Sequence, residues 1–318
     1  MTWPDDVDEI LGGDLTAALS YSTPARGAVP SAVAPIGMRD RDAGTVTFTT
    51  SLGFGKKLER IESDPRISLA YHAREHGRTD RPDYVLVEGR AEPDHSQSQA
   101  RRDDIRERAA DYLGDLKSGF FWDRWMREYY IVRIPVDVRV ERVIVWPDLS
   151  CSGEPQVLGA PLPDPPDSQA PPKKGTGPRI DVNKAAAKVR EQPHVLLSYV
   201  RADGYPAVVP VELRSAGPDG FELAAGRAGL IPPGGRRAGL LAHAYKPQLV
   251  GLVSHVYTGW LESDGDGSAT YAPHTEGGFK APANKTLLAL ANGFLAKRGY
   301  KQARREGKVP AGRSSSPD

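Results

Sequence analysis

The sequence predicts a mainly β (α+β) protein built from two small barrels with short helices, and three observations carry this prediction. The chain has 33 glycines and 28 prolines among 318 residues, so its backbone turns often, which favours many short strands. A proline-rich segment divides the chain nearly in half. Similar strand patterns occur on both sides of that segment, and at about 100 to 200 residues per domain the length fits two domains.

The first strands of the two halves carry the same tripeptide. Leu-Ser-Tyr occurs at Leu19–Tyr21 and again at Leu197–Tyr199, and a glycine turn and an extended run with Val and Pro follow each copy. The next matched strands are Val46–Thr50 with Phe221–Ala225, Ile67–Tyr71 with Leu249–Val253, and Val87–Glu92 with Tyr257–Glu262. An internal duplication explains this order, and two unrelated β domains with chance matches are the alternative.

Short helical patterns lie between and after the strands. Each half has a basic pair, Lys56–Lys57 or Arg236–Arg237, and we expect a short helix after it that ends near Pro65 or Pro247. The other expected elements are helices at 97–116 and 285–304 and strands at 128–134 and 139–146, which would close the first barrel.

Residues 151–180 are expected to form a linker. Eight prolines lie between positions 154 and 178, with almost no large apolar side chains to offset the entropy of ordering, which is typical of a semi-rigid connection. The predicted domains are therefore residues 1–150 and 181–306, followed by a disordered tail at 307–318.

Composition excludes several classes of protein. Lys and Arg number 42 against 41 Asp and Glu, and a net charge of +1 argues against nucleic acid as a partner. The single cysteine excludes a disulfide scaffold. The acidic N-terminus does not match a signal peptide, and no run of about 18 apolar residues occurs, so we expect a cytoplasmic protein with no membrane partner.

The stretch from Thr49 to Lys57 holds the most informative pattern. The hydroxyls of Thr49, Thr50 and Ser51 stand at the end of a strand, glycines follow, and Lys56 and Lys57 begin a helical pattern. Amides at a helix N-terminus and lysine ammonium groups together favour an anion, so this loop is a candidate phosphate site. A solvated connection between strand and helix is the alternative.

The ordered set of motifs resembles the pyridoxamine 5'-phosphate oxidase-like superfamily of FMN-binding split β-barrels, in a tandem duplicated form. The stretches that carry the resemblance are Pro30–Pro35, Thr47–Thr50, Lys57–Leu69 and Val85–Ala91, with a looser counterpart over 195–262. Lys57 stands eight residues before Pro65, which is the spacing between a lysine and an Asp-Pro or Asn-Pro step in that family.

The resemblance implies a cofactor, FMN, and a place for it. Its phosphate would lie near Thr49–Lys57 and its isoalloxazine ring against Val33–Gly37. The implied cofactor-binding residues are Lys57, with Lys56, Thr50 and Ser51 as helpers and with Thr49 and Arg60 nearby. The resemblance also implies two split barrels arranged as an intrachain pseudo-dimer, in a protein that is a monomer or a homodimer.

The implied function is an FMN-binding oxidoreductase that transfers a hydride to or from an unknown small organic substrate. No side chain stands out as a catalytic acid or base. A deazaflavin-dependent reductase of the same fold and a non-catalytic flavin- or haem-binding module are the alternatives. In the second half the longer segment Gly229–Arg237 replaces the lysine loop, so that pocket is expected to be altered or vestigial, although Arg236 and Arg237 could clamp a phosphate.

The seven histidines raise the question of a metal or a haem. His72 and His76 are four residues apart, but they lie in a stretch typical of a loop, and no third ligand occurs at metal-site spacing, so no metal is predicted. A haem ligand among His72, His243 and His255 remains an alternative.

Overall fold

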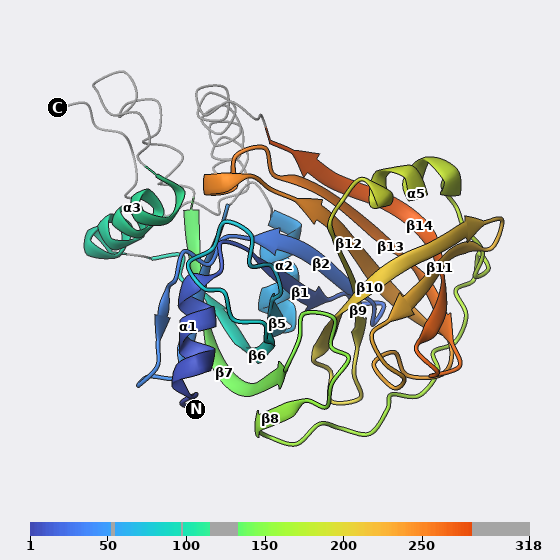
Figure 1. The fold of residues 1–318 in the computed structure, drawn as a ribbon, viewed down its shortest axis with the longest axis horizontal. Helices are drawn as coiled ribbons and strands as arrows, with labels where there is room; N and C mark the ends of the chain where they lie inside the picture. The colour runs from blue at the N-terminus through green and yellow to red at the C-terminus, as the bar shows by residue number, and fades with distance from the viewer. Residues whose placement is uncertain (52–54, 97, 115–132, 282–318) are drawn as a thin grey trace.

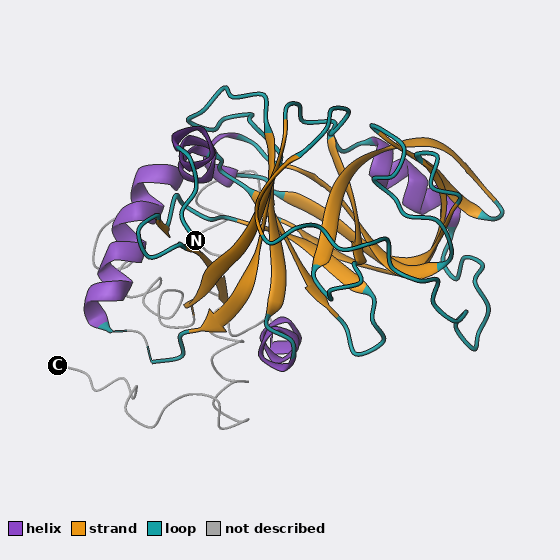
Figure 2. Cartoon of the chain, turned by 90° about the horizontal axis from the view of Figure 1, so that it is seen from below, coloured by secondary structure: helices purple, strands orange, loops and turns teal. Residues whose placement is uncertain are grey.

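Two β-sheets lie side by side in the computed structural model, which describes residues 1–51, 55–96, 98–114 and 133–281 (Figure 1). The described helices lie at the periphery of the strands (Figure 2). The helix expected at 285–304 and the tail expected at 307–318 lie outside the described residues. Within the described part of the chain, no helix has the length and apolarity needed to cross a bilayer.

The first half forms an eight-stranded antiparallel sheet with the order β2-β1-β5-β6-β7-β4-β3, and β8 pairs with β7. Its elements are α1 (Asp5–Gly13), β1 (Ala17–Ser22), β2 (Ala28–Val33), β3 (Arg39–Asp40), β4 (Thr45–Ser51), α2 (Gly55–Ser63), β5 (Arg66–Tyr71), β6 (Tyr84–Pro93), α3 (Gln99–Leu113), β7 (Arg133–Trp146) and β8 (Gln156–Gly159).

The second half forms a closed barrel of six strands, in the order β10-β11-β14-β13-β12-β9. Its elements are α5 (Val182–Arg190), β9 (His194–Val200), β10 (Pro206–Gly217), β11 (Gly220–Ala225), β12 (Arg236–Ala244), the 3-10 turn η2 (Pro247–Leu249), β13 (Val253–Ser263) and β14 (Ser268–Lys280). The predicted mainly β fold class is thus confirmed.

The two sheets follow one strand order when β1, β2, β4, β5, β6 and β7 are matched in turn with β9, β10, β11, β12, β13 and β14. The match extends to single residues, because the pairing register shifts at Gly89 of β6 and at Gly259 of β13. At both glycines a Cβ atom would collide with a backbone carbonyl of the neighbouring strand. These two bulges therefore fix which positions correspond.

The registers place Val46–Thr50 and Phe221–Ala225 in equivalent positions, as the sequence comparison expects. The expectation for Ile67–Tyr71 is wrong. Its structural counterpart is Ala238–Ala242 in β12, because Ser68 pairs with Ser20 as Gly239 pairs with Ser198. The expectation of a short helix after Arg236–Arg237 is also wrong, because these residues begin the strand β12.

This error has a physical cause in the burial of β12. The strand pairs with β9 on one side and with β13 on the other, and its residues from Ala238 to His243 are all buried. A strand buried on both faces has a continuous apolar run rather than an alternating one, and such a run also fits a helix.

Two other expected elements differ from the structure. A single strand, β7, runs from Arg133 to Trp146 across the gap that was expected between two strands, because it pairs with β4 over 133–139 and with β6 over 136–146. Positions 128–132 of the first expected strand lie outside the described residues. The expected linker contains β8, which pairs with the end of β7. By contrast, the helix expected at 97–116 is confirmed by α3, which Ser98 caps by accepting a hydrogen bond from the Arg101 amide.

One apolar cluster joins the two sheets. It contains Ala18, Ala70 and Tyr84 from the first sheet together with Leu197 and Val208 from the barrel. Polar contacts cross the same boundary: Tyr84 donates a hydrogen bond to the Val208 carbonyl at 2.7 Å, and Ser20 and Ser198 share a buried hydrogen bond of 2.7 Å between their hydroxyls. We call this boundary the seam.

Candidate functional site

The predicted phosphate loop lies at the junction of β4 and α2. Thr49 Oγ1 accepts a hydrogen bond of 3.1 Å from Arg133 Nη1. Thr50 is buried, and its hydroxyl has no hydrogen-bond partner among the described residues. Ser51, which ends β4, pairs with Arg133 across the ladder to β7. Successive side chains of a strand point to opposite faces, so Thr49 and Ser51 share the face of Arg133, whereas Thr50 lies on the other face with Val46 and Phe48. The sequence prediction did not include this guanidinium.

Lys57 is half-buried in the first turn of α2, and its Nζ donates a hydrogen bond of 2.9 Å to Ser31 Oγ on β2. The pKa of Lys57 is lowered to about 8, first by burial and then by the positive charge of Arg133. Two cations thus lie close enough to repel one another. An anion between them would relieve that repulsion, so this position favours a bound phosphate.

The other predicted site residues lie further from this centre. Lys56 is exposed to solvent. Arg60, one turn along α2, hydrogen-bonds the phenol of Tyr21 in β1 and opposes the rise in the Tyr21 pKa that burial causes. The structure therefore groups Thr49, Ser51 and Lys57 with Arg133, and it engages Arg60 with the first sheet.

The group that the sequence prediction missed is brought in by long-range pairing. Ser31 and Arg133 lie 26 and 76 residues from Lys57 in the sequence, and only strand pairing places them beside the loop. No local motif marks either residue, although Ser31 lies in the extended run that the resemblance already included.

The seam forms one side of this site, because β2 crosses β12 at close range. A Cβ atom at Gly239 in β12 would lie 2.5 Å from the Ala28 carbonyl oxygen of β2. The chain then leaves β2 at Val33 and turns through Ile36 and Gly37, which have φ angles of 45° and 61°. The segment Val33–Gly37, against which the flavin ring is expected, thus follows directly from the strand that packs on the second barrel.

The residues present fit a phosphate ester. Lys57 and Arg133 supply positive charge, and Thr49 and Ser51 supply hydroxyls.

The counterpart in the second half does not carry this chemistry. Arg236 is buried and donates to the carbonyl oxygens of Pro166, Pro232 and Pro233, and Arg237 donates to Gln169 at 3.1 Å. Both guanidinium groups are therefore used within the protein, and the predicted possibility of a phosphate clamp at Arg236–Arg237 is not supported.

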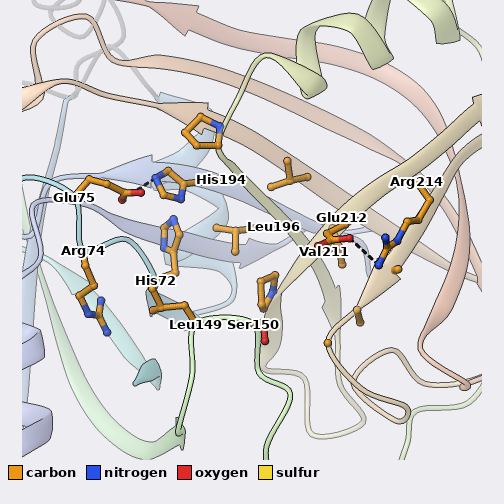
Figure 3. A pocket seen from close by; sticks show the side chains of 16 residues that line it. His72, Arg74, Glu75, Leu149, Ser150, His194, Leu196, Val211, Glu212 and Arg214 are labelled. Carbon is orange, nitrogen blue, oxygen red and sulfur yellow. Dashed lines mark ion pairs between the residues drawn. The ribbon is translucent and has the colours of Figure 1, made fainter. Parts of the chain in front are cut away.

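Three histidines from separate elements meet at the seam, beside a cavity of about 810 Å³ (Figure 3). His72 follows β5, His194 begins β9 and His243 lies in β12, with ring centres 5.0 to 5.5 Å apart. His72 Nε2 and His243 Nε2 are 2.7 Å apart, and His72 Nδ1 contacts the Ala70 carbonyl at 2.9 Å. His194 Nε2 lies 3.1 Å from Glu75.

Sequence spacing did not reveal this cluster, because its members are more than 45 residues apart. Burial lowers the pKa of His72 to about 3 and that of His243 well below its usual value. The pair is therefore neutral at pH 7. Within the residues described, no group of three or more His, Cys, Asp or Glu side chains has an arrangement that could hold a metal ion.

No protein-family model and no curated protein matches this chain. Similar solved structures include the conserved hypothetical protein Rv2991 from Mycobacterium tuberculosis, with 18% identity and a TM-score of 0.36 over 51% of this chain and 94% of that one. A pyridoxamine 5'-phosphate oxidase-related, FMN binding protein from Nostoc punctiforme matches with 10% identity and a TM-score of 0.30, over 62% and 87% of the two chains. An F420 reductase matches with 17% identity and a TM-score of 0.30, over 44% and 95%.

Proposed function

We propose that the chain binds FMN at the junction of β4 and α2 and acts as an oxidoreductase on a small organic substrate. The observation that carries the proposal is the pair of neighbouring cations, Lys57 and Arg133, beside the hydroxyls that end β4. Two cations with hydroxyl donors match a phosphate monoester, which is dianionic above a pKa of about 6.

In this proposal the chain's own residues hold and orient the cofactor. Lys57 and Arg133 neutralise the phosphate, and Thr49 and Ser51 donate hydrogen bonds to it, whereas Thr50 lies on the opposite face of β4. The segment Val33–Gly37 carries the flavin ring, and the packing of β2 on β12 limits access of water from that side. When bound, the flavin supplies the hydride transfer.

The duplication and the domain division are part of the same proposal. Residues 1–150 and 181–306 would be two copies of one split barrel joined by 151–180, forming an intrachain pseudo-dimer. The common strand order, the equivalent bulges at Gly89 and Gly259, and the contact between Ser20 and Ser198 support it. A solution mass of twice the chain, with a groove formed between chains, would count against it.

Two alternatives remain. A deazaflavin cofactor would use the same basic site. A haem module has less support, because His72 uses both ring nitrogens within the protein and His243 Nε2 contacts His72.

An absorption titration of the purified protein with FMN, a deazaflavin and haemin tests these assignments. We expect a shifted flavin spectrum on adding FMN, and turnover of the reduced cofactor with an electron acceptor. Binding of haemin alone would overturn the proposal, and uptake of FMN without turnover would reduce it to a binding module.

A further inference from the structure

The cavity beside the histidines occupies, in the second half, the place that the proposed cofactor site has in the first. The pairing registers match Thr49, Thr50 and Ser51 with Ala224, Ala225 and Gly226. All three of the latter residues line the cavity. The cavity itself is defined by its lining and volume, and only its comparison with the first site rests on the proposed function.

The groups that suit the first site to phosphate are missing from this cavity. The three hydroxyls of the first half are replaced by two alanines and a glycine. Residues 226–235 run as a loop from β11 into β12, so the cavity has no counterpart of α2 or of Lys57. A phosphorylated ligand would therefore lose its main contacts here.

The charged side chains of the lining balance one another, because two arginines, Arg74 and Arg214, stand against two glutamates, Glu75 and Glu212. Arg74 forms an ion pair with the buried Asp14, Glu212 lies 2.7 Å from Arg214, and Glu75 lies 3.1 Å from His194. The cavity therefore presents little net charge to a ligand.

The apolar part of the lining comes from both halves of the chain. Leu149 faces the cavity from the first half, and Leu196, Val211 and Ala225 face it from the barrel (Figure 3 labels the first three). At about 810 Å³, the cavity falls within the range of about 300 to 1,000 Å³ that is usual for small-molecule sites.

Among the polar groups of the lining, His194 has a defined role. Because a carboxylate only accepts hydrogen bonds, Nε2 of His194 carries the proton toward Glu75, and Nδ1 of the neutral ring is left as an acceptor. Burial, the largest influence on the His194 pKa, lowers it and favours that neutral form. His194 and Pro193 both line the cavity. Because aromatic rings pack on one another by an edge or a face, the imidazole suits an aromatic ligand.

We propose that this cavity is a second ligand site, which binds an uncharged aromatic molecule that has an N–H or O–H donor and no phosphate. The two sites of the chain then differ in ligand class, one anionic and one neutral.

Lumichrome is a suitable probe, because it is uncharged and tricyclic, carries N–H donors and has no phosphate. Its binding is measured by fluorescence on the full chain, with and without saturating FMN. We expect lumichrome to bind in both conditions. Ala225→Trp fills the cavity from the barrel side and should weaken lumichrome binding at least tenfold without changing FMN binding.

Leu149→Trp, which lines the cavity from the first half of the chain, provides a second variant if the first fails to fold, and the exposed Leu162→Trp is the matched control. No lumichrome binding, loss of that binding when FMN is present, or equal affinity in wild type and both cavity variants would overturn the inference. If FMN fails to bind but lumichrome binding depends on Ala225 or Leu149, the second site stands and the proposed function falls.

Discussion

His72 and His243 occupy equivalent positions in the two halves, and their Nε2 atoms meet at 2.7 Å inside the seam. Ser68 precedes His72 by four residues, as Gly239 precedes His243, and these two residues pair with Ser20 and Ser198. The hydrogen bond between Ser20 and Ser198 thus belongs to the same local symmetry. A pair of histidines and a pair of serines thus join the two halves, and each pair brings together two equivalent positions.

The histidine pair predicts a specific loss of stability in acid. Burial first, and then the neighbouring His194, lower the pKa of His72 to about 3, so the folded protein holds the ring neutral. The unfolded chain takes up that proton near pH 6.5. The contribution of each buried histidine to the free energy of unfolding is therefore fully present above about pH 6.5. It is lost as the pH drops toward 3, by up to about 1.4 kcal/mol per pH unit for each histidine.

Urea unfolding between pH 7 and pH 4 measures this loss. The double variant His72→Leu, His243→Leu replaces both partners by apolar groups and should flatten the pH dependence. The exposed His95→Gln serves as the control and should not flatten it. If the free energy of unfolding of the double variant falls with pH as steeply as that of the wild type, the histidine pair is not the cause of the loss.

Lys57→Ala should weaken FMN much more than riboflavin, which lacks the phosphate. A charge-assisted hydrogen bond contributes about 1.5 to 3 kcal/mol, so the FMN dissociation constant should rise by roughly 10- to 150-fold. Lys56→Ala, at the adjacent exposed position, should change it little. Fluorescence titration of both ligands measures these effects, and equal losses for FMN and riboflavin would remove Lys57 from the phosphate site.

The lowered pKa of Lys57 predicts that FMN binding weakens in mild alkali. The ammonium group of the ligand-free protein deprotonates as the pH rises through about 8, so affinity should decline by up to about tenfold per pH unit above that value. Riboflavin affinity should stay level. Lys57→Arg keeps its charge and should remove the dependence, and a decline that persists in this variant would show that another group titrates.

Gly239→Ala should destabilise the seam. Its new Cβ atom would meet the Ala28 carbonyl oxygen at 2.5 Å, and relieving such an overlap costs about 1 to 3 kcal/mol. Gly217→Ala is a matched control, because nothing lies within 4 Å of the place that its Cβ atom would take and its φ angle is not in the left-handed region. Chemical denaturation compares the two variants, and similar unfolding free energies would show that β2 does not pack tightly on β12.

The parts of the structure that the sequence predicted depend on local patterns. The turn-rich composition indicated strands, the charged helical spacing indicated α3, and the hydroxyl, glycine and lysine pattern located the junction of β4 and α2. Each of these signals lies within one short stretch of chain.

The parts that the sequence did not predict depend on contacts between distant segments. Arg133 reaches Thr49 through the ladder between β4 and β7, and the three histidines meet where the two halves pack. The apolar run in β12 fits both a helix and a buried strand, and only its pairing with β9 and β13 decides between them.

The replacement of Thr49, Thr50 and Ser51 by Ala224, Ala225 and Gly226 has a consequence for evolution. In a homodimer, one mutation alters both symmetry-related grooves at once. If this chain holds two copies of one split barrel, as we propose, each site is encoded by its own codons, so selection can reshape one of them while the other stays intact. A single chain with two unequal grooves thus escapes a constraint that identical subunits impose.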